Sequence, residues 1–172
     1  MELSEAIEKR RSVRSYKEKE IEDEKIREII EKGQCAPSAG NLQARDFIVV
    51  EGKEKKRRIA KAASQKFIEK APTVIVVCAN KRRSAKKYGD RGRNLYAIQD
   101  ASVATQNMLL TIHAMGVSSC WIGAFDERKV KEILNLPKNV RPITILPVGY
   151  SDQNPKPPSR KNLEEVVHKE EW

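Results

Sequence analysis

The sequence has few of the features that belong to membrane, fibrous or disulfide-stabilised proteins. Its 172 residues contain no apolar run near the roughly 18 residues needed to cross a bilayer. The first residues, Met1 to Arg11, lack the apolar core of a secretory signal. The cysteines Cys35, Cys78 and Cys120 are odd in number and far apart, which predicts free thiols in a cytoplasmic protein. The length then indicates one compact domain.

Common catalytic and nucleotide-binding signatures are also missing. The chain has no G-x-G-x-x-G after a strand, no Walker loop and no G-x-S-x-G elbow. His113 and His168 stand alone without metal-ligand spacing, so we predict no metal site and interpret His113 as a hydrogen-bonded core residue. An enzyme with neither its own nucleophile nor a metal takes its chemistry from a bound organic cofactor.

Aromatic residues are scarce at 5%, whereas 34 Lys and Arg against 24 Asp and Glu give a net charge of +10. This excess favours an anionic partner such as nucleic acid, an acidic membrane surface or a phosphorylated cofactor. A well-solvated surface with the ion-pair networks of a heat-adapted protein explains it as well. The scarcity of aromatics and the mixing of cations with acids disfavour a nucleic-acid-binding module. We therefore predict neither a nucleic acid nor a membrane as partner.

Hydrophobic periodicity predicts a mixture of helices and strands. Helices are expected at 3–10, 22–32 with Gly33 as a cap, 53–63, 95–115 and 127–134, and strands at 46–50, 73–79, 118–122 and 143–148. The β-branched run 73–79 should be covered on both faces, and the apolar helix 95–115 should be buried at a subunit interface. The elements do not alternate regularly, which indicates an α+β fold.

Two segments are expected to be irregular. Residues 81–93 combine many cations with Gly89 and Gly92, which predicts an exposed, mobile connection. Residues 151–159 are rich in proline and should be extended, leading to a short amphipathic piece at 163–167. Such tails rarely stay ordered alone, so we predict one domain over 1–172 whose tail, 151–172, lies across a second subunit.

Arg10, Arg11, Ser12 and Arg14 form the first candidate binding cluster. Three guanidinium groups and a hydroxyl within five residues suit a phosphate dianion, because arginine presents a planar fork of donors to it. The simpler explanation is that cations gather at a helix C-terminus to complement the helix dipole. Composition alone leaves both explanations open.

The second candidate is the loop Pro37-Ser38-Ala39-Gly40-Asn41-Leu42-Gln43. Its small residues let the main chain approach a flat ligand, and its two amide side chains can pair with ring nitrogens and carbonyls. An ordinary connection between a helix and a strand would have a similar composition. Taken alone, the loop does not separate these two interpretations.

Five motifs in this order resemble the nitroreductase family of flavin enzymes: R-R-S-V-R-S-Y, A-P-S-A-G-N-L-Q, W-I-G-A-F, P-V-G-Y and R-K-N-L-E-E-V-V-H-K-E-E-W. The resemblance runs from about residue 2 to the end of the chain. It implies an α+β fold in which helices flank a mixed sheet. It also implies an intertwined homodimer with FMN bound at each of two subunit interfaces.

The resemblance implies an FMN site made of four segments. The first cluster would bind the phosphate, ribityl chain and ring edge, and the loop after the second helix would reach FMN from the other subunit. The W-I-G motif would lie beside the ring near its reactive nitrogen, and two residues of the tail would close on the phosphate. The residues so implied are Arg10, Arg11, Ser12 and Arg14, then Pro37, Ser38, Ala39 and Asn41, then Ile122 and Gly123, and finally Arg160 and Lys161.

The activity that the resemblance implies is a ping-pong oxidoreductase reaction. NADH or NADPH would give a hydride to the flavin and leave, and a small acceptor such as a nitro compound or a quinone would take its place. No side chain is required as acid or base. Reductive dehalogenation and flavin fragmentation, which relatives of this fold perform, stay open as alternatives.

Two departures from the family pattern stand out. Many members follow N-x-Q with Pro-Trp, whereas here Ala44-Arg45 follows. The stretch 52–93 is also short, and leaves little room for the helical excursion that covers the substrate channel in longer relatives. We hypothesise that residues 81–93 act instead as a flexible basic lid.

Overall fold

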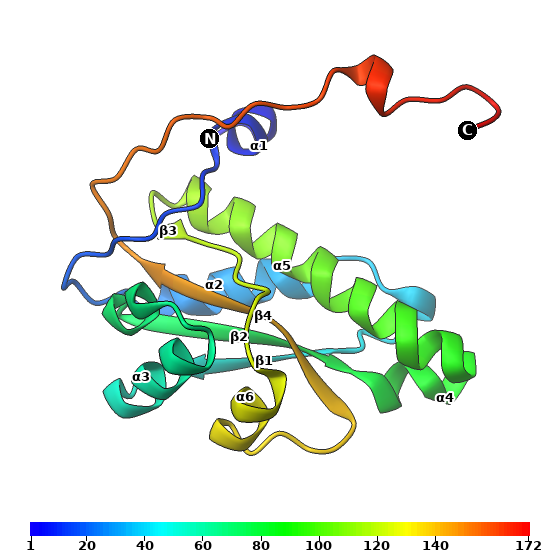
Figure 1. Ribbon diagram of the computed structural model, residues 1–172, viewed down its shortest axis with the longest axis horizontal. Coiled ribbons are helices and arrows are strands. Elements are labelled where there is room, and N and C mark those ends of the chain that lie inside the picture. Colours follow the sequence, from blue (N-terminus) through cyan, green and yellow to red (C-terminus); the bar gives the residue numbers. More distant parts are fainter.

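Four strands form the centre of the molecule (Figure 1) in the computed structural model, which describes residues 1–172. They are β1 (Arg45–Val50), β2 (Thr73–Asn80), β3 (Ser118–Ser119) and β4 (Val140–Gly149). Their order in the sheet is β1-β2-β4-β3, and each neighbouring pair is antiparallel. A parallel bridge between Ser12 and Ser119 adds the N-terminal segment to the β3 edge. This bridge is what makes the sheet mixed.

Helices cover both faces of the sheet. They are α1 (Leu3–Lys9), α2 (Asp23–Gln34), α3 (Lys53–Ala62), α4 (Lys81–Arg91), α5 (Ala97–Ala114) and α6 (Glu127–Ile133). On one face α2 and α5 share a core with Ile75 and Val77 of β2, and on the other α3 and α6 share a core with Val74 and Val76. None of the helices is both long and apolar enough to cross a membrane. Residues 73–79 are all buried, and the predicted α+β class is confirmed.

The predicted boundaries hold within a few residues, with two differences. The strand expected at 118–122 is reduced to β3 and an isolated bridge between Ile122 and Ile145. The prediction that Gly33 ends its helix is wrong, because α2 continues through it to Gln34. A Cβ at Gly33 would lie 2.7 Å from Cγ of Met108 on α5. This glycine is therefore required for close packing of α2 on α5.

The prediction of a mobile connection at 81–93 is wrong. These residues form α4 and a π-helical turn, Gly92–Tyr96, that leads directly into α5. Asn80 caps α4 by accepting a hydrogen bond from the Arg83 amide at 3.1 Å, and Ser84 is fully buried. A Cβ at Gly92 would lie 2.6 Å from the Ser84 carbonyl oxygen, so Gly92 serves packing. The hypothesis of a flexible lid falls with the prediction.

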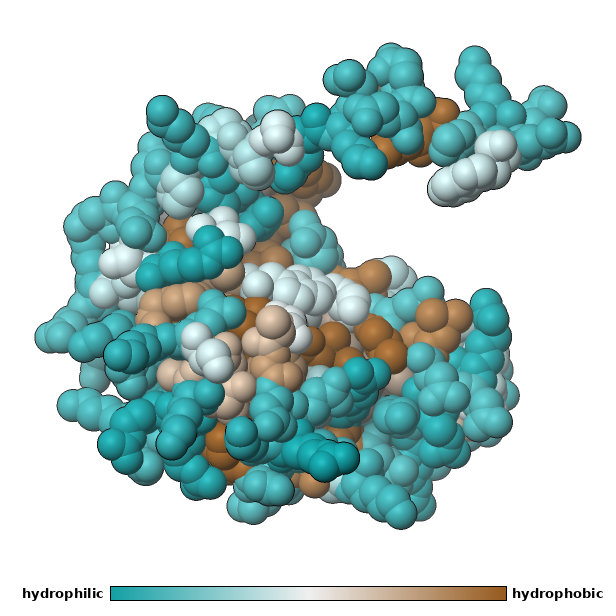
Figure 2. Space-filling model, in the orientation of Figure 1, coloured by the Kyte–Doolittle hydropathy of each residue, from teal (hydrophilic) through white to brown (hydrophobic).

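The tail, residues 151–172, first passes beside the N-terminal segment, and its last part then runs away from the body of the molecule, as Figures 1 and 2 show. It is extended apart from one 3-10 turn, Leu163–Glu165, and none of its residues is buried. Leu163, Val166, Val167 and Trp172 are all exposed, Leu163 by 71%. Exposed apolar side chains gathered on one segment are typical of interaction surfaces.

Candidate functional site

The N-terminal arginine cluster lies where the first segment passes the end of α5. Arg10 and Arg11 line a small cavity of about 100 Å³ together with His113 and Ser119. Ser12 and Arg14 line a wider hollow of about 450 Å³. Residues 153–155 of the tail border both spaces, and the Arg14 amide donates to Gln153 Oε1 at 3.2 Å. The cluster and the start of the tail thus form one continuous surface.

The cations of this surface have no acidic partners. None of Arg10, Arg11, Arg14, Arg160 and Lys161 forms an ion pair. Burial, together with the charges of Arg11 and Arg160, lowers the pKa of Arg10. The fold therefore brings Arg160 of the tail within electrostatic reach of Arg10, whereas Lys161 is exposed and makes no polar contact. Arg10 and Arg11 are partly buried, and partly buried cations without carboxylates indicate a site for an anion.

Two buried polar atoms in the small cavity also lack partners. They are Ser119 Oγ, on a residue only 4% exposed, and His113 Nε2. Buried polar groups are normally hydrogen-bonded, so each unpaired one requires an explanation. A hydroxyl and an imidazole beside guanidinium groups are the donors that phosphate oxygens accept from, and the residues present therefore fit a phosphorylated ligand. Ser119 was not among the predicted site residues, and the interpretation of His113 as hydrogen-bonded is wrong for Nε2.

Acid should destabilise the ligand-free protein in part through His113. Burial and the charges of Arg10, Arg11 and Lys9 lower the pKa of His113, opposed only by Glu5. A histidine with a lowered folded-state pKa binds its proton more readily in the unfolded chain, so its stabilising contribution is lost as pH falls below about 6.5. Between about pH 7.5 and about pH 5.5, Tm should fall more steeply in the wild type than in His113→Gln. Equal slopes would contradict this.

A larger cavity of about 720 Å³ lies between residues 16–23 and α3 and contains none of the predicted site residues. Its wall mixes cations with acids, namely Lys17, Lys19, Lys53, Lys56, Arg57 and Lys70 with Glu18, Glu20, Asp23, Glu51 and Glu69. Opposite charges so close together give no preference for an anion. The arginine surface is therefore the better candidate for an anion-binding site than this cavity.

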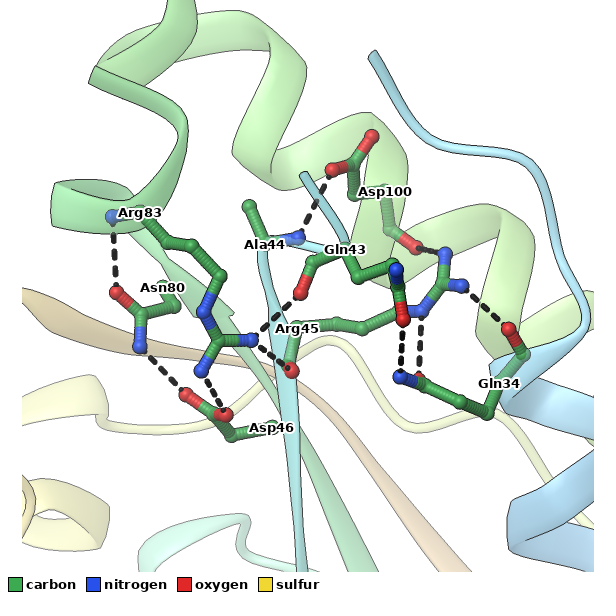
Figure 3. A network of polar contacts seen from close by, with 8 residues as sticks. All are labelled: Gln34, Gln43, Ala44, Arg45, Asp46, Asn80, Arg83 and Asp100. Atoms are coloured by element: carbon green, nitrogen blue, oxygen red, sulfur yellow. Dashed lines mark hydrogen bonds and ion pairs between the residues drawn. The ribbon is translucent and has the colours of Figure 1, made fainter. Parts of the chain in front are cut away.

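The loop 37–43 is held in one conformation by Asp100 of α5 (Figure 3). Asp100 is buried, and one of its carboxylate oxygens accepts a hydrogen bond from the Ala44 amide at 3.0 Å, as Figure 3 shows. The other oxygen accepts from the Ala39 amide at 3.1 Å. Gly40, Asn41 and Gln43 have φ between 50° and 57°, the left-handed region that costs a non-glycine residue about 1–2 kcal/mol. The buried carboxylate compensates this strain and presents a preformed loop.

Arg45, which stands where the family pattern has tryptophan, holds the start of the same loop through hydrogen bonds to its backbone. The side chain is 2% exposed and donates to the backbone carbonyls of Gln34, Ala36 and Pro37 at 2.7, 2.7 and 3.1 Å. Arg83 of α4 binds the carbonyl of Gln43, as Figure 3 shows. The loop is thus tied to α2, α4 and α5 at once.

The arginine surface and the loop lie at opposite ends of α5. Asp100, which holds the loop, and His113, which lines the small cavity, are thirteen residues apart on this helix. At 1.5 Å per residue they are separated by about 20 Å along the helix axis. One chain therefore does not bring the two predicted halves of the site together.

Ile122 and Gly123 behave differently from each other. Ile122 is buried, and its amide and carbonyl pair with Ile145 at 3.1 and 3.0 Å. Gly123, by contrast, is exposed, and its amide donates to no group of the chain. Ile122 thus anchors the segment to β4, and Gly123 is the residue with a free donor.

The chain thus has an α+β fold with cations that lack acidic partners along one edge. The sequence model of the Nitroreductase family matches residues 7–69 and 60–150. A Methanothermobacter thermautotrophicus relative is 31% identical over 100% of this chain and 88% of its own. The NADPH-flavin oxidoreductase of Vibrio harveyi is 30% identical over 94% of this chain and 71% of its own.

A solved structure gives the same result. The NADPH:FMN oxidoreductase from Vibrio harveyi, complexed with NAD⁺, has a TM-score of 0.90 and 30% identity, covering 99% of this chain and 77% of the other. The chain belongs to the nitroreductase family.

Proposed function

We propose that the protein is an FMN-dependent oxidoreductase that passes electrons from NADH or NADPH to small acceptors such as nitro compounds and quinones. The names of the similar proteins, NADPH-flavin oxidoreductase and FMN reductase, support the cofactor and the donor. The observation that carries the proposal is the pair of partly buried cations, Arg10 and Arg11, which lack acidic partners and lie beside the unpaired Ser119 hydroxyl. Such a surface provides both charge and donors for a phosphate.

In this proposal each segment has a separate task. Arg10, Arg160 and Lys161 hold the phosphate, while Arg11, Ser12, Arg14 and Ser119 supply donors around it. The Gly123 amide faces the ring edge, and Pro37, Ser38, Ala39 and Asn41 approach from the partner subunit. The chemistry that FMN supplies when bound is the transfer of two electrons from a reduced nicotinamide to an acceptor, in two half-reactions that use one pocket in turn. The protein's cations provide a positive field for the added negative charge.

A homodimer is part of the proposal because one chain leaves the site incomplete. The loop lies about 20 Å from the arginine surface along α5, and an intertwined partner would bring its own loop to that surface. The exposed apolar residues of the tail, together with exposed Val103 of α5, would then be covered. We also propose one domain over 1–172 with 151–172 as the wrapping tail, in a cytoplasm that keeps all three cysteines free.

The test is FMN binding by the wild type and by Arg10→Ala. The purified protein should show flavin absorbance that bleaches anaerobically with NADH or NADPH. Arg10→Ala should weaken FMN binding about 10- to 100-fold, since a charged hydrogen bond contributes about 1.5–3 kcal/mol. The Tm of ligand-free Arg10→Ala should not fall, because the substitution removes a cation that Arg11 and Arg160 repel. The control is Arg27→Ala. Arg27 is exposed on α2 and paired with Glu31, so this variant should bind FMN like the wild type.

Two results would overturn the proposal. One is a wild-type protein that stays colourless with excess FMN at micromolar concentration. The other is wild-type FMN affinity in Arg10→Ala, which would remove the phosphate from the arginine surface.

A further inference from the structure

Helix α4 lies directly against the loop that the proposed function places at the flavin. A Cβ at Gly40 would lie 2.6 Å from the Tyr88 hydroxyl oxygen and 3.1 Å from Lys87 Nζ. Both side chains therefore sit over the loop backbone, next to Ala39 and Asn41, which the site is proposed to use. A ligand that extended past this side of the loop would therefore lie near Lys87 and Tyr88.

The charge of α4 is concentrated and largely unpaired. Residues 81–93 contain seven cations and one acid, Asp90. Arg83 is paired with Asp46 at 2.7 Å and Arg93 with Asp90 at 3.6 Å, and no other cation of the segment forms an ion pair. Arg83 thus has a structural task, whereas Lys87, one turn further along the same face, has none. Its ammonium group is free to bind an anion.

Tyr88 is fixed in place beside this free charge. Its ring packs edge-on against Tyr96 with centroids 5.1 Å apart, and Lys87 Nζ lies 5.4 Å from the Tyr88 ring centroid. Arg91 donates to the Tyr96 hydroxyl at 2.9 Å, which secures the pair from the other side. A positioned hydroxyl next to an unpaired ammonium is a suitable donor pair for phosphate oxygens.

The two alternating ligands of the proposed pocket differ in charge. A nicotinamide dinucleotide carries a diphosphate a few bonds from its ring, whereas nitro compounds and quinones of the proposed class carry none. We infer that Lys87 and Tyr88 bind the diphosphate of the dinucleotide donor, which makes α4 the element that recognises the donor. This inference rests on the proposed function, since it requires the loop 37–43 to border the flavin pocket.

The test compares two electron donors with the holoenzyme. One is NADH, and the other is 1-benzyl-1,4-dihydronicotinamide, which has the reacting ring but no phosphate. The measured quantity is the ratio of kcat/KM for NADH to kcat/KM for the benzyl compound. In Lys87→Ala this ratio should fall about 5- to 20-fold, in line with the loss of one partly solvated charged hydrogen bond. Tyr88→Phe, which keeps the packing on Tyr96, should lower the ratio to a smaller extent.

Arg82→Ala is the matched control. Arg82 is an exposed cation of the same helix, but five residues from Lys87 it points about 140° away around the helix axis. The ratio should stay at the wild-type value in Arg82→Ala. In Lys87→Arg, which keeps the charge, the ratio should stay close to the wild-type value. An unchanged ratio in Lys87→Ala overturns the inference, and so does an equal fall in Arg82→Ala, which would indicate a general field. Failure of the proposed function looks different: the wild type would then be reduced by neither donor.

Discussion

Removal of residues 151–172 should give a folded monomer that no longer retains FMN. The tail supplies Arg160, and residues 153–155 border both spaces of the arginine surface. Losing the charged contacts of Arg160 and Lys161, at about 1.5–3 kcal/mol each, should weaken FMN binding by a factor on the order of 10³. The same truncation removes the exposed Leu163, Val166 and Val167, which we propose to pack on the partner. Analytical ultracentrifugation and FMN titration measure the two losses.

The truncated chain should nevertheless fold. No residue of the tail is buried, and neither core cluster extends past Tyr150. Its circular dichroism should therefore match that of the full chain over the same wavelengths. A truncated protein that stays dimeric, or that stays yellow after dialysis, would contradict the wrapping tail.

Two variants separate the two tasks of the tail. Arg160→Ala combined with Lys161→Ala removes charge only, so the protein should stay dimeric and bind FMN less tightly. Leu163→Ser combined with Val166→Ser keeps the charge and removes apolar contact area. This second variant should shift the dimer toward monomer, with FMN binding lost in proportion.

The elements that the sequence predicts well are those whose burial pattern is local. The run 73–79 shows its double coverage in its own composition, and α2 and α6 show an apolar stripe within two or three turns. The prediction for residues 81–93 failed because their stabilisation is long-range. Arg83 binds Asp46 and the carbonyls of Gln43 and Arg45, residues 37 to 40 positions earlier in the chain. Nothing in the segment itself indicates these partners.

The candidate site also has a part that the sequence predicts and a part that depends on long-range contacts. Spacing predicts the arginine cluster, and the family resemblance adds Arg160, but only the fold shows that these cations lack acidic partners. Ser119 was missed because a serine in a short strand has no distinguishing pattern, and its importance comes from being buried without a partner. The sequence shows Arg45 as a departure from the family pattern, yet its role depends on carbonyls at the end of α2 that only the folded chain brings to it.

Arg45→Ala should lower the stability of the protein more than Arg10→Ala, Lys87→Ala or His113→Gln. The guanidinium group donates to four backbone carbonyls and to the side chain of Gln34. Alanine leaves these acceptors buried without donors and opens a cavity, at a cost of about 3 kcal/mol after the relief of a buried charge is subtracted. For a domain of this length Tm should fall by roughly 6–12 °C. Thermal unfolding of the ligand-free protein measures the change.

Arg45→Ala should also lower the affinity for FMN, because Arg45 binds the carbonyls that join the end of α2 to the loop 37–43. FMN affinity measured well below the lowered Tm should be reduced, since the loop then has to be ordered on binding. Arg58→Ala, at an exposed arginine of α3, is the control and should change neither quantity. Arg45→Lys keeps the charge but reaches fewer carbonyls, so it should fall between the two. If Arg45→Ala lowered Tm yet left FMN affinity unchanged, Arg45 would serve the core alone and the loop would be held sufficiently by Asp100.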